Sequence, residues 1–485
     1  EEEEEDEEED VPEDTAEDTT QKTEETQKEG EAPTTQDNAE KPCEIVKELF
    51  SNVENLKQAC PTKYGKNAPT SWKCISDTTT GGEPTGNDGA ICIPPRRRKM
   101  YIGPLKTWAN NSGNDTQVSG EAQTQGSSNT TVNVDDGLLK AFVESAAVET
   151  FFLWDRYKKE NKPQNTSQLQ LLTSTLENSG EQNPQTSLQK GHIPPDFLRQ
   201  MFYTLADYKD ILYSGSNDTT SVSKDTPSSS SNDNLKNIVL EASGNTEEGK
   251  KDMRKIQEKL KTFFSNSGDK PSTVTSGPSS VKPGSNSGND PASWWKQHAE
   301  SIWKGMVCAL TYEESGAKGQ SSNIQQNSGL KSALLDTNNK PKNTQYQYKT
   351  VELKDNDENG AKSTQSSASG TKLTDFVLRP TYFRYLEEWG ETFCKERKKR
   401  LEKIKYECRN SEQEGKRHCS GDGHDCTENG NLKHKDISAD LYCPDCYKQC
   451  RKYKKWIDIK FVEYHKQENK YEGERGKLTK DKSGG

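Results

Sequence analysis

Three cysteines fall within eight residues in the segment Cys443-Pro-Asp-Cys446-Tyr-Lys-Gln-Cys450. This segment closes a block of six cysteines that covers residues 408–450. Two more even blocks precede it, one of four cysteines within residues 43–92 and one of two at residues 308 and 394. Even blocks predict disulfides that close within three structural units, in an oxidising and extracellular setting. The pairing inside the larger blocks stays open, since spacing alone does not fix it.

The same segment contains a C-x-x-C motif, which also occurs in zinc sites and in redox proteins. A zinc set would draw on the nearby residues His418, Cys419, His424 and Cys426. Disulfides are favoured, because the block pairs without remainder and the β-α-β setting of a redox motif is absent. We predict no metal ion and no cofactor. The cysteines assigned to structural disulfides are Cys43, Cys60, Cys74, Cys92, Cys308, Cys394, Cys408, Cys419, Cys426, Cys443, Cys446 and Cys450.

The composition is polar, with 28% hydrophobic residues and a mean hydropathy of −1.14. Residues 1–40 hold 20 acids and 2 bases. We predict that residues 1–42 form a disordered acidic linker, because they have too few apolar residues to offset the entropy of ordering. The sequence has no run of 18 apolar residues and no secretory leader, so we expect the membrane anchor to lie outside this piece.

Polar tracts rich in Ser, Asn, Thr, Gly and Gln alternate with islands rich in aromatic residues and leucine. We predict that the tracts are surface loops, since a buried loop would leave backbone polar groups unpaired. They cover residues 109–137, 161–190, 214–234, 265–291 and 313–371.

The islands show the three-to-four residue spacing of amphipathic helices. Helices are predicted over residues 138–160, 194–213, 248–264 and 291–312. Two longer helices, over residues 380–408 and 443–471, have equal length and carry cysteines near one end, which predicts an antiparallel hairpin. The second has apolar positions at Ile457, Phe461 and Tyr464. The clearest extended segment is Gln345–Lys354, where a slip in the apolar phase predicts a bulge or an edge strand.

A compact cationic run, Pro94-Pro95-Arg96-Arg97-Arg98-Lys99, begins two residues after Cys92. One interpretation is a heparan-sulfate-type polyanion site, formed by Arg96, Arg97, Arg98 and Lys99 together with basic faces of the long helices. The other is a structural turn whose arginines pair with acids on neighbouring helices. The basic helix faces contain Lys398, Lys399, Arg400, Lys452, Lys454 and Lys455.

Catalytic signals are missing from the sequence. It has no phosphate-binding loop, no dinucleotide fingerprint, no nucleophile elbow and no H-E-x-x-H motif. We therefore predict a binding module and not an enzyme. A disulfide-bonded extracellular chain also makes a nucleic-acid partner unexpected.

Several blocks together resemble a known family, in the family's own order over residues 43–471. They resemble the Duffy-binding-like domains of the malaria parasite's erythrocyte membrane protein 1 family. The blocks are Cys92-Ile-Pro-Pro-Arg-Arg-Arg-Lys-Met-Tyr-Ile-Gly-Pro-Leu105, Ala141-Phe-Val-Glu-Ser-Ala-Ala-Val-Glu-Thr-Phe-Phe-Leu-Trp154, Ile193-Pro-Pro-Asp-Phe-Leu-Arg-Gln-Met-Phe-Tyr203, Ile302-Trp-Lys-Gly-Met-Val-Cys-Ala-Leu310, Arg379-Pro-Thr-Tyr-Phe-Arg-Tyr-Leu-Glu-Glu-Trp-Gly-Glu391 and Cys443-x-x-Cys-x-x-x-Cys450.

The third and fifth blocks look most like the beta class, which is associated with binding intercellular adhesion molecule 1 on endothelium. The resemblance implies a mostly α, disulfide-stapled helical fold with long polar loops and three subdomains. They map to residues 43–137, which would be loop-rich with two disulfides, 138–393, a helical bundle, and 394–471, a cysteine-rich hairpin. Residues 472–485 would be a C-terminal tail. The resemblance also implies a monomeric adhesion module displayed on infected erythrocytes.

The resemblance places the receptor site in the C-terminal third of the domain. We predict an exposed strand-and-loop docking surface for the immunoglobulin-like part of the receptor. Its residues would be Tyr346, Tyr348, Val351, Leu353 and Lys354. The alternative is that these tyrosines cover the helical bundle and contact no ligand. The alternative function is polyanion binding through Arg96–Lys99 and the basic helices.

Overall fold

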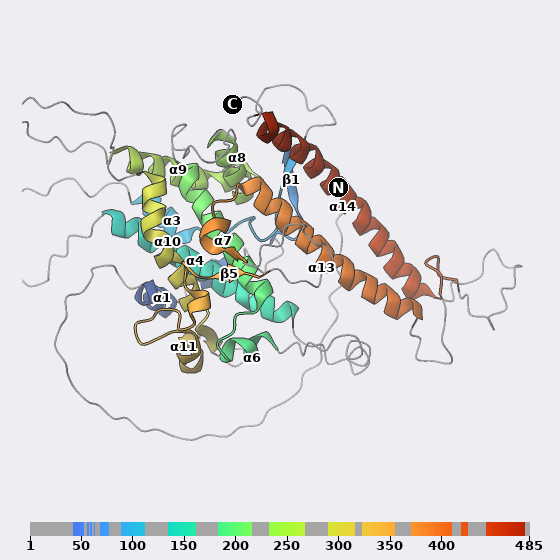
Figure 1. Cartoon of the computed structure of the whole chain (residues 1–485), viewed down its shortest axis with the longest axis horizontal. Coiled ribbons are helices and arrows are strands. Elements are labelled where there is room, and N and C mark those ends of the chain that lie inside the picture. The colour runs from blue at the N-terminus through green and yellow to red at the C-terminus, as the bar shows by residue number, and fades with distance from the viewer. Residues whose placement is uncertain are drawn as a thin grey trace, which may run out of the picture. The chain divides into compact units, whose positions relative to one another are not determined.

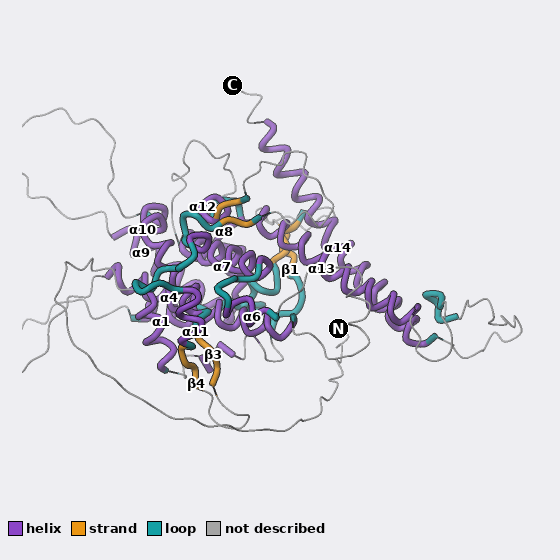
Figure 2. Tube along the Cα trace, turned by 60° about the horizontal axis from the view of Figure 1, so that its bottom comes forward, coloured by secondary structure: helices purple, strands orange, loops and turns teal. Residues whose placement is uncertain are grey.

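Helices make up most of the residues that the computed structural model describes, and strands occur there only as short pairs (Figure 2). The predicted mostly helical fold is therefore confirmed. The predicted linker lies outside the described residues apart from Pro42, and so does most of each of the first four polar tracts. The structure describes residues 42–52, 56–57, 59–60, 63, 68–76, 89–111, 134–161, 183–215, 232–266, 290–315, 323–354, 370–409, 419–424 and 443–480.

The centre of the bundle is α4 (Val134–Glu160), which packs against α7 (Pro195–Ser214) and α10 (Pro291–Ala309). Every side chain of α4 from 138 to 154 is buried except at Lys140 and Glu144. α10 approaches α4 closely at Gly305, where a Cβ would stand only 2.7 Å from Cγ1 of Val143. A glycine is therefore needed at this contact.

Seven further helices of the described residues surround this centre. They are α1 (Pro42–Ser51), α3 (Gly103–Asn110), α6 (Pro184–Gln189), α8 (Asn232–Ser243), α9 (Glu247–Asn266), α11 (Ser328–Leu334) and α12 (Leu373–Phe376). The four helices predicted for the bundle are confirmed within a few residues as α4, α7, α9 and α10. The helices that were not predicted from the sequence are short. A short helix has too few turns for a repeat of apolar residues every three or four positions to be recognised.

Within the described residues, three antiparallel strand pairs connect the helices. β1 (Lys73–Ser76) pairs with β2 (Ala90–Ile93), β3 (Tyr312–Ser315) with β4 (Asn323–Gln326), and β5 (Glu352–Leu353) with β6 (Thr371–Lys372). The strand predicted over Gln345–Lys354 is wrong except at these two residues of β5. The first part of this segment forms the 3-10 helix η1 (Thr344–Tyr346) and a turn. The slip in the apolar phase therefore reflects a turn and not a bulge in a strand.

The predicted long hairpin is confirmed. α13 (Thr381–Arg409) and α14 (Pro444–Lys480) run side by side in opposite directions (Figure 1). α14 continues to Lys480, past the end predicted at Tyr471. The ring of Phe393 on α13 stacks on Trp456 of α14, with centroids 5.4 Å apart and planes at 6°. β2 also contacts both helices, so the hairpin is held against the rest of the unit.

The disulfides correct the prediction of pairing within blocks. Cys43 pairs with Cys308, across 265 residues of sequence, because α1 packs against α10. The bond joins the first block to the second, so residues 43–137 do not enclose two disulfides. The other three bonds respect the blocks and are Cys74–Cys92, Cys408–Cys446 and Cys419–Cys443.

Three cysteines predicted to be paired are free thiols in the structure: Cys60, Cys394 and Cys450. With Cys308 bonded to Cys43, the expected partner of Cys394 is no longer available. Cys426 lies outside the described residues. The division into three subdomains stays a prediction, and residues Glu40–Gly485 form one compact unit.

Candidate functional site

The predicted docking strand is turned toward the bundle. Tyr346 is 5% exposed, and its hydroxyl accepts a hydrogen bond from the backbone N–H of Ile193 over 3.0 Å. Its carbonyl accepts a hydrogen bond from Nε1 of Trp303 over 2.7 Å. Val351 and Leu353 are also buried. These three residues fasten their segment to the core, so they do not form the exposed surface that was predicted.

The remaining two predicted residues differ from each other. Tyr348 is half-buried against the core, and burial raises the pKa of its phenol to about 12. Lys354 is exposed. Tyrosines that cover the bundle were the alternative interpretation, and the position of Tyr346 agrees with it.

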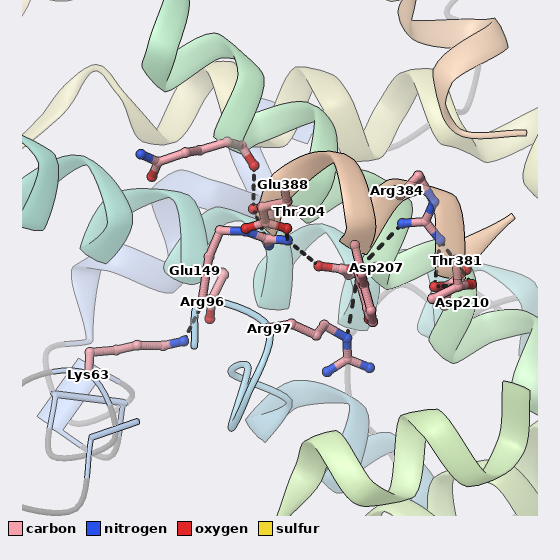
Figure 3. A network of polar contacts seen from close by, with 12 residues as sticks. Lys63, Arg96, Arg97, Glu149, Thr204, Asp207, Asp210, Thr381, Arg384 and Glu388 are labelled. Carbon is pink, nitrogen blue, oxygen red and sulfur yellow. Dashed lines mark hydrogen bonds and ion pairs between the residues drawn. The ribbon is translucent and has the colours of Figure 1, made fainter. Parts of the chain in front are cut away.

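The cationic run is a turn between β2 and α3 that sends its first two arginines inward (Figure 3). Arg96 binds Glu388 through two parallel hydrogen bonds of 2.9 and 3.0 Å, and it donates to Asp207 over 2.7 Å. Burial opposes the charge on Arg96, but the carboxylates of Glu388 and Asp207 outweigh it and raise the pKa of this arginine. The side chain of Arg97 is 1% exposed, with Nε 3.8 Å from Asp207.

A third arginine approaches the same acid from the hairpin. Arg384 of α13 lies 3.4 Å from Asp207 and 2.6 Å from Asp210 of α7 (Figure 3). Asp207 therefore faces Arg96, Arg97 and Arg384, and it ties the turn and α13 to α7. Buried and paired, Arg96 and Arg97 cannot contact a polyanion. The structural turn was the correct interpretation of this run.

The other half of the run holds the turn in place. Nη1 of Arg98 donates to the carbonyl of Ser71 over 2.9 Å. Lys99 has a φ of 53°, and its backbone N–H donates to the carbonyl of Ala242 on α8 over 2.9 Å. These contacts also fit a structural turn.

The cysteine cluster beside the hairpin tip does not fit the zinc interpretation. Cys408, Cys446 and Cys450 bring their sulfur atoms within 4.8 Å of one another. Two of these sulfurs form a disulfide, and a disulfide sulfur is not the thiolate that zinc binds. Cys419 is bonded to Cys443, whereas His418 and Cys426 lie outside the described residues.

The outer side of α14 exposes apolar side chains. We name this surface the outer patch and define it as Ile459, Phe461, Val462, Tyr464 and His465. The exposed fractions of its first four members are 57%, 60%, 53% and 44%. Six of the seven large hydrophobic residues that are exposed in the described part of the chain lie on α13 or α14. An apolar group of this kind on an extracellular protein is typical of a protein-binding surface.

Along residues 463–470 the inner side of the same helix is polar. Glu463, Gln467 and Lys470 are buried there, at 8%, 1% and 8% exposure. Glu463 accepts hydrogen bonds from Nε1 of Trp389 over 2.7 Å and from Lys460 over 2.8 Å. The usual polarity of a surface helix is thus reversed in this stretch of α14. The buried polar contacts stabilise the packing of α14 on α13. The exposed apolar side chains do not contribute to this packing, which supports a binding role for the outer patch.

Ring contacts connect the outer patch to the interior of the hairpin. The ring of Phe461 meets that of His465 at 4.3 Å, and His465 meets Tyr464 at 5.8 Å. Tyr464 in turn lies 6.2 Å from Trp389, which stacks on Phe393 at 5.3 Å. Packed rings lose little further freedom on binding, so this support makes the patch suited to a partner.

The sequence pattern included Phe461 and Tyr464 among the apolar positions of the helix but did not show that they face outward. The sequence pattern does not distinguish an apolar residue that faces the core from one that faces solvent. The one available signal was polar, because Glu463, Gln467 and Lys470 repeat at the same three-to-four residue spacing.

Two family models match the chain. The model of the Duffy binding domain matches residues 90–413, and the model of the Duffy-binding-like domain, C-terminal subdomain, matches residues 388–484. The second match includes the whole outer patch. A search of the curated proteins finds no match. Among the described residues, no helix is both long and apolar enough to cross a membrane.

Proposed function

This chain belongs to the Duffy-binding-like family, whose members are extracellular receptor-binding adhesion domains, and we propose that its receptor is intercellular adhesion molecule 1 on endothelium. The resemblance of two sequence blocks to the beta class supports this receptor. In the same proposal the domain acts from the surface of infected erythrocytes and mediates their adhesion to the vessel wall. The family is one of binding domains and is not a known enzyme family.

The outer patch on α14 is the observation that carries this proposal. It lies in the C-terminal third of the domain, where the resemblance places the receptor site, although not in the segment Gln345–Lys354. Aromatic anchors with apolar neighbours are the residue types that contribute most to protein–protein affinity. Phe461 and Tyr464 are aromatic anchors of this kind, at 60% and 44% exposure, and Val462 is an apolar neighbour.

The outer patch needs neighbours to form a complete interface. A specific interface buries about 800 Å² on each partner, which corresponds to roughly 20 residues or more. Five side chains of one helix cannot supply this area. The exposed sides of α13 and α14 on either side of the patch would supply the rest, as the polar rim of an apolar centre.

The receptor assignment is tested by surface plasmon resonance with the outermost immunoglobulin-like part of intercellular adhesion molecule 1 on the chip. The expected result is saturable binding of the folded chain, with a dissociation rate that changes little between about 50 and about 300 mM salt because the apolar centre governs it. Circular dichroism confirms that the injected chain is folded. No binding of folded protein at micromolar concentration would eliminate this receptor.

A further inference from the structure

The half of the hairpin next to the disulfide tip is strongly basic. On α13, residues 394–409 hold eight bases and three acids, and on α14, residues 444–456 hold five bases and one acid. The antiparallel packing brings the two segments together, as the contact of Arg400 with the ring of Trp456 at 5.0 Å shows. Positive charge that is spread over two sequence segments thus gathers at one end of the hairpin.

Much of this charge is exposed and not neutralised. Arg400 pairs with Glu396, and Lys395 lies 3.3 Å from Asp196. By contrast, several exposed bases of these two segments make no ion pair within the described part of the chain. Five of them, which we name the basic face, are Lys399, Arg451, Lys452, Lys454 and Lys455. The intramolecular contacts of the domain therefore do not explain their charge.

The basic face is continuous with the outer patch. Arg451, Lys455, Ile459 and Val462 follow one another at intervals of four, four and three residues on α14. Residues at these intervals lie on one side of a helix, one turn above another. All four are exposed. A partner seated on the apolar patch would therefore have its edge over the cations.

We infer that the receptor surface that docks on the outer patch carries carboxylates beside its apolar centre, and that the basic face steers it into place. This inference rests on the proposed function and names the chemistry of the partner. Complementary charge at the edge of an interface acts mainly on the association rate, by factors of about 10 to 1,000, and salt screens it. The apolar patch would instead govern the dissociation rate.

The test reverses the charge at three lysines of the basic face. It measures the association and dissociation rates on immobilised intercellular adhesion molecule 1. The variant is Lys452→Glu, Lys454→Glu, Lys455→Glu. A control variant, Lys47→Glu, Lys251→Glu, Lys261→Glu, makes the same change of net charge at exposed lysines of α1 and α9. We expect the association rate of the first variant to fall roughly tenfold or more at about 50 mM salt, and the difference to close at about 500 mM. The control should fall by much less.

The other outcomes are informative. Failure of the unaltered chain to bind the receptor would remove the proposed function and this inference with it. Receptor binding with equal association rates in all three proteins would overturn this inference alone. A separate arm measures binding to immobilised heparin. If the reversed variant loses heparin binding while its receptor kinetics stay unchanged, the basic face serves a sulfated polysaccharide and the inference is wrong.

Discussion

The indole Nε1 of Trp389 donates a hydrogen bond to the carboxylate of Glu463 over 2.7 Å, inside the interface between α13 and α14. Lys460 donates to the same oxygen, so one buried carboxylate is satisfied from two sides. An apolar residue at position 463 would leave the indole without this partner. The contact fixes which side of α14 faces inward, and it thereby sends Phe461 and Val462 outward.

Replacing Glu463 should destabilise the hairpin. In Glu463→Leu, the buried Nε1 of Trp389 loses its acceptor, which costs about 1–3 kcal/mol for an unsatisfied donor. Chemical denaturation followed by tryptophan fluorescence measures the change in the free energy of unfolding. Glu468→Leu is the control, because Glu468 contacts only exposed side chains. Equal stability of the two variants would show that the carboxylate of Glu463 does not anchor α14.

Truncating the outer patch should weaken receptor binding and leave the fold intact. We expect Phe461→Ala to lower the affinity at least roughly tenfold, which corresponds to about 1.4 kcal/mol. The thermal midpoint should stay unchanged, since the side chain is 60% exposed. Leu378→Ala is a matched control, because Leu378 is a 64% exposed apolar residue that is not part of α14. Surface plasmon resonance that gives the same affinity for both variants would refute the outer patch as the docking surface.

Tyr346 should matter for stability and not for adhesion. In Tyr346→Phe, the backbone N–H of Ile193 loses its acceptor, and we expect a loss of about 1–3 kcal/mol in the free energy of unfolding. Urea denaturation gives this value, and receptor affinity measured on the folded variant should equal that of the unaltered chain. A selective loss of affinity with unchanged stability would restore the segment Gln345–Lys354 as the receptor site.

Removing the charge of Asp207 should be among the most disruptive single substitutions. Asp207→Asn leaves Arg96, Arg97 and Arg384 buried with less negative charge, and breaking a buried ion pair costs about 3–5 kcal/mol. Thermal denaturation measures the effect. Asp196→Asn is the control, since Asp196 pairs with Lys395 at a surface where both side chains are 55% exposed. A small shift in both variants would mean that the network is solvated.

Lys209 gives the domain a stability that depends on pH. Burial lowers the pKa of its ammonium group to about 8, although Nζ donates to the carbonyl of Val377 over 2.8 Å. The unfolded chain keeps this proton up to a pKa of about 10.4, so between these values the unfolded state binds more protons. The contribution of Lys209 therefore rises as pH increases through this window and is lost as pH falls below about 8.

The comparison of the unaltered chain with Lys209→Met isolates this effect. The difference between their free energies of unfolding should shift in favour of the unaltered chain by up to about 1.4 kcal/mol per pH unit within the window. Other groups that titrate there are common to both proteins and cancel in the difference. Parallel curves of stability against pH would contradict the lowered pKa.

The long helices could be predicted from the sequence because their signal is local. In α4 and α13 the apolar side chains repeat every three or four residues over many turns. The partner of Cys43 could not be predicted, because Cys308 is distant in sequence and near only after α1 has packed on α10. The grouping of cysteines into even blocks was a coincidence of spacing for this pair.

The candidate site was predicted less well, for a physical reason. Tyr346 and Tyr348 have the residue type of a binding surface, but a tyrosine that covers a bundle looks the same in sequence. Arg96 and Arg97 resembled an anion site because their acidic partners, Asp207 and Glu388, lie far along the chain. Burial of a polar residue depends on such distant partners, and local sequence does not contain them.

The bond between Cys43 and Cys308 also determines how the domain carries mechanical load. In the proposed function the domain would work under the drag of flowing blood, so tension would enter at one point of the chain and leave at another. Tension applied at Cys43 passes directly to Cys308 and bypasses the chain between them, a sequence separation of 265. The bond between Cys408 and Cys446 shortens the path again, across 38 positions. The path of the force then follows the chain from Cys308 to α13 and crosses the second bond to α14, the helix that bears the outer patch, so the helices between Cys43 and Cys308 lie outside it.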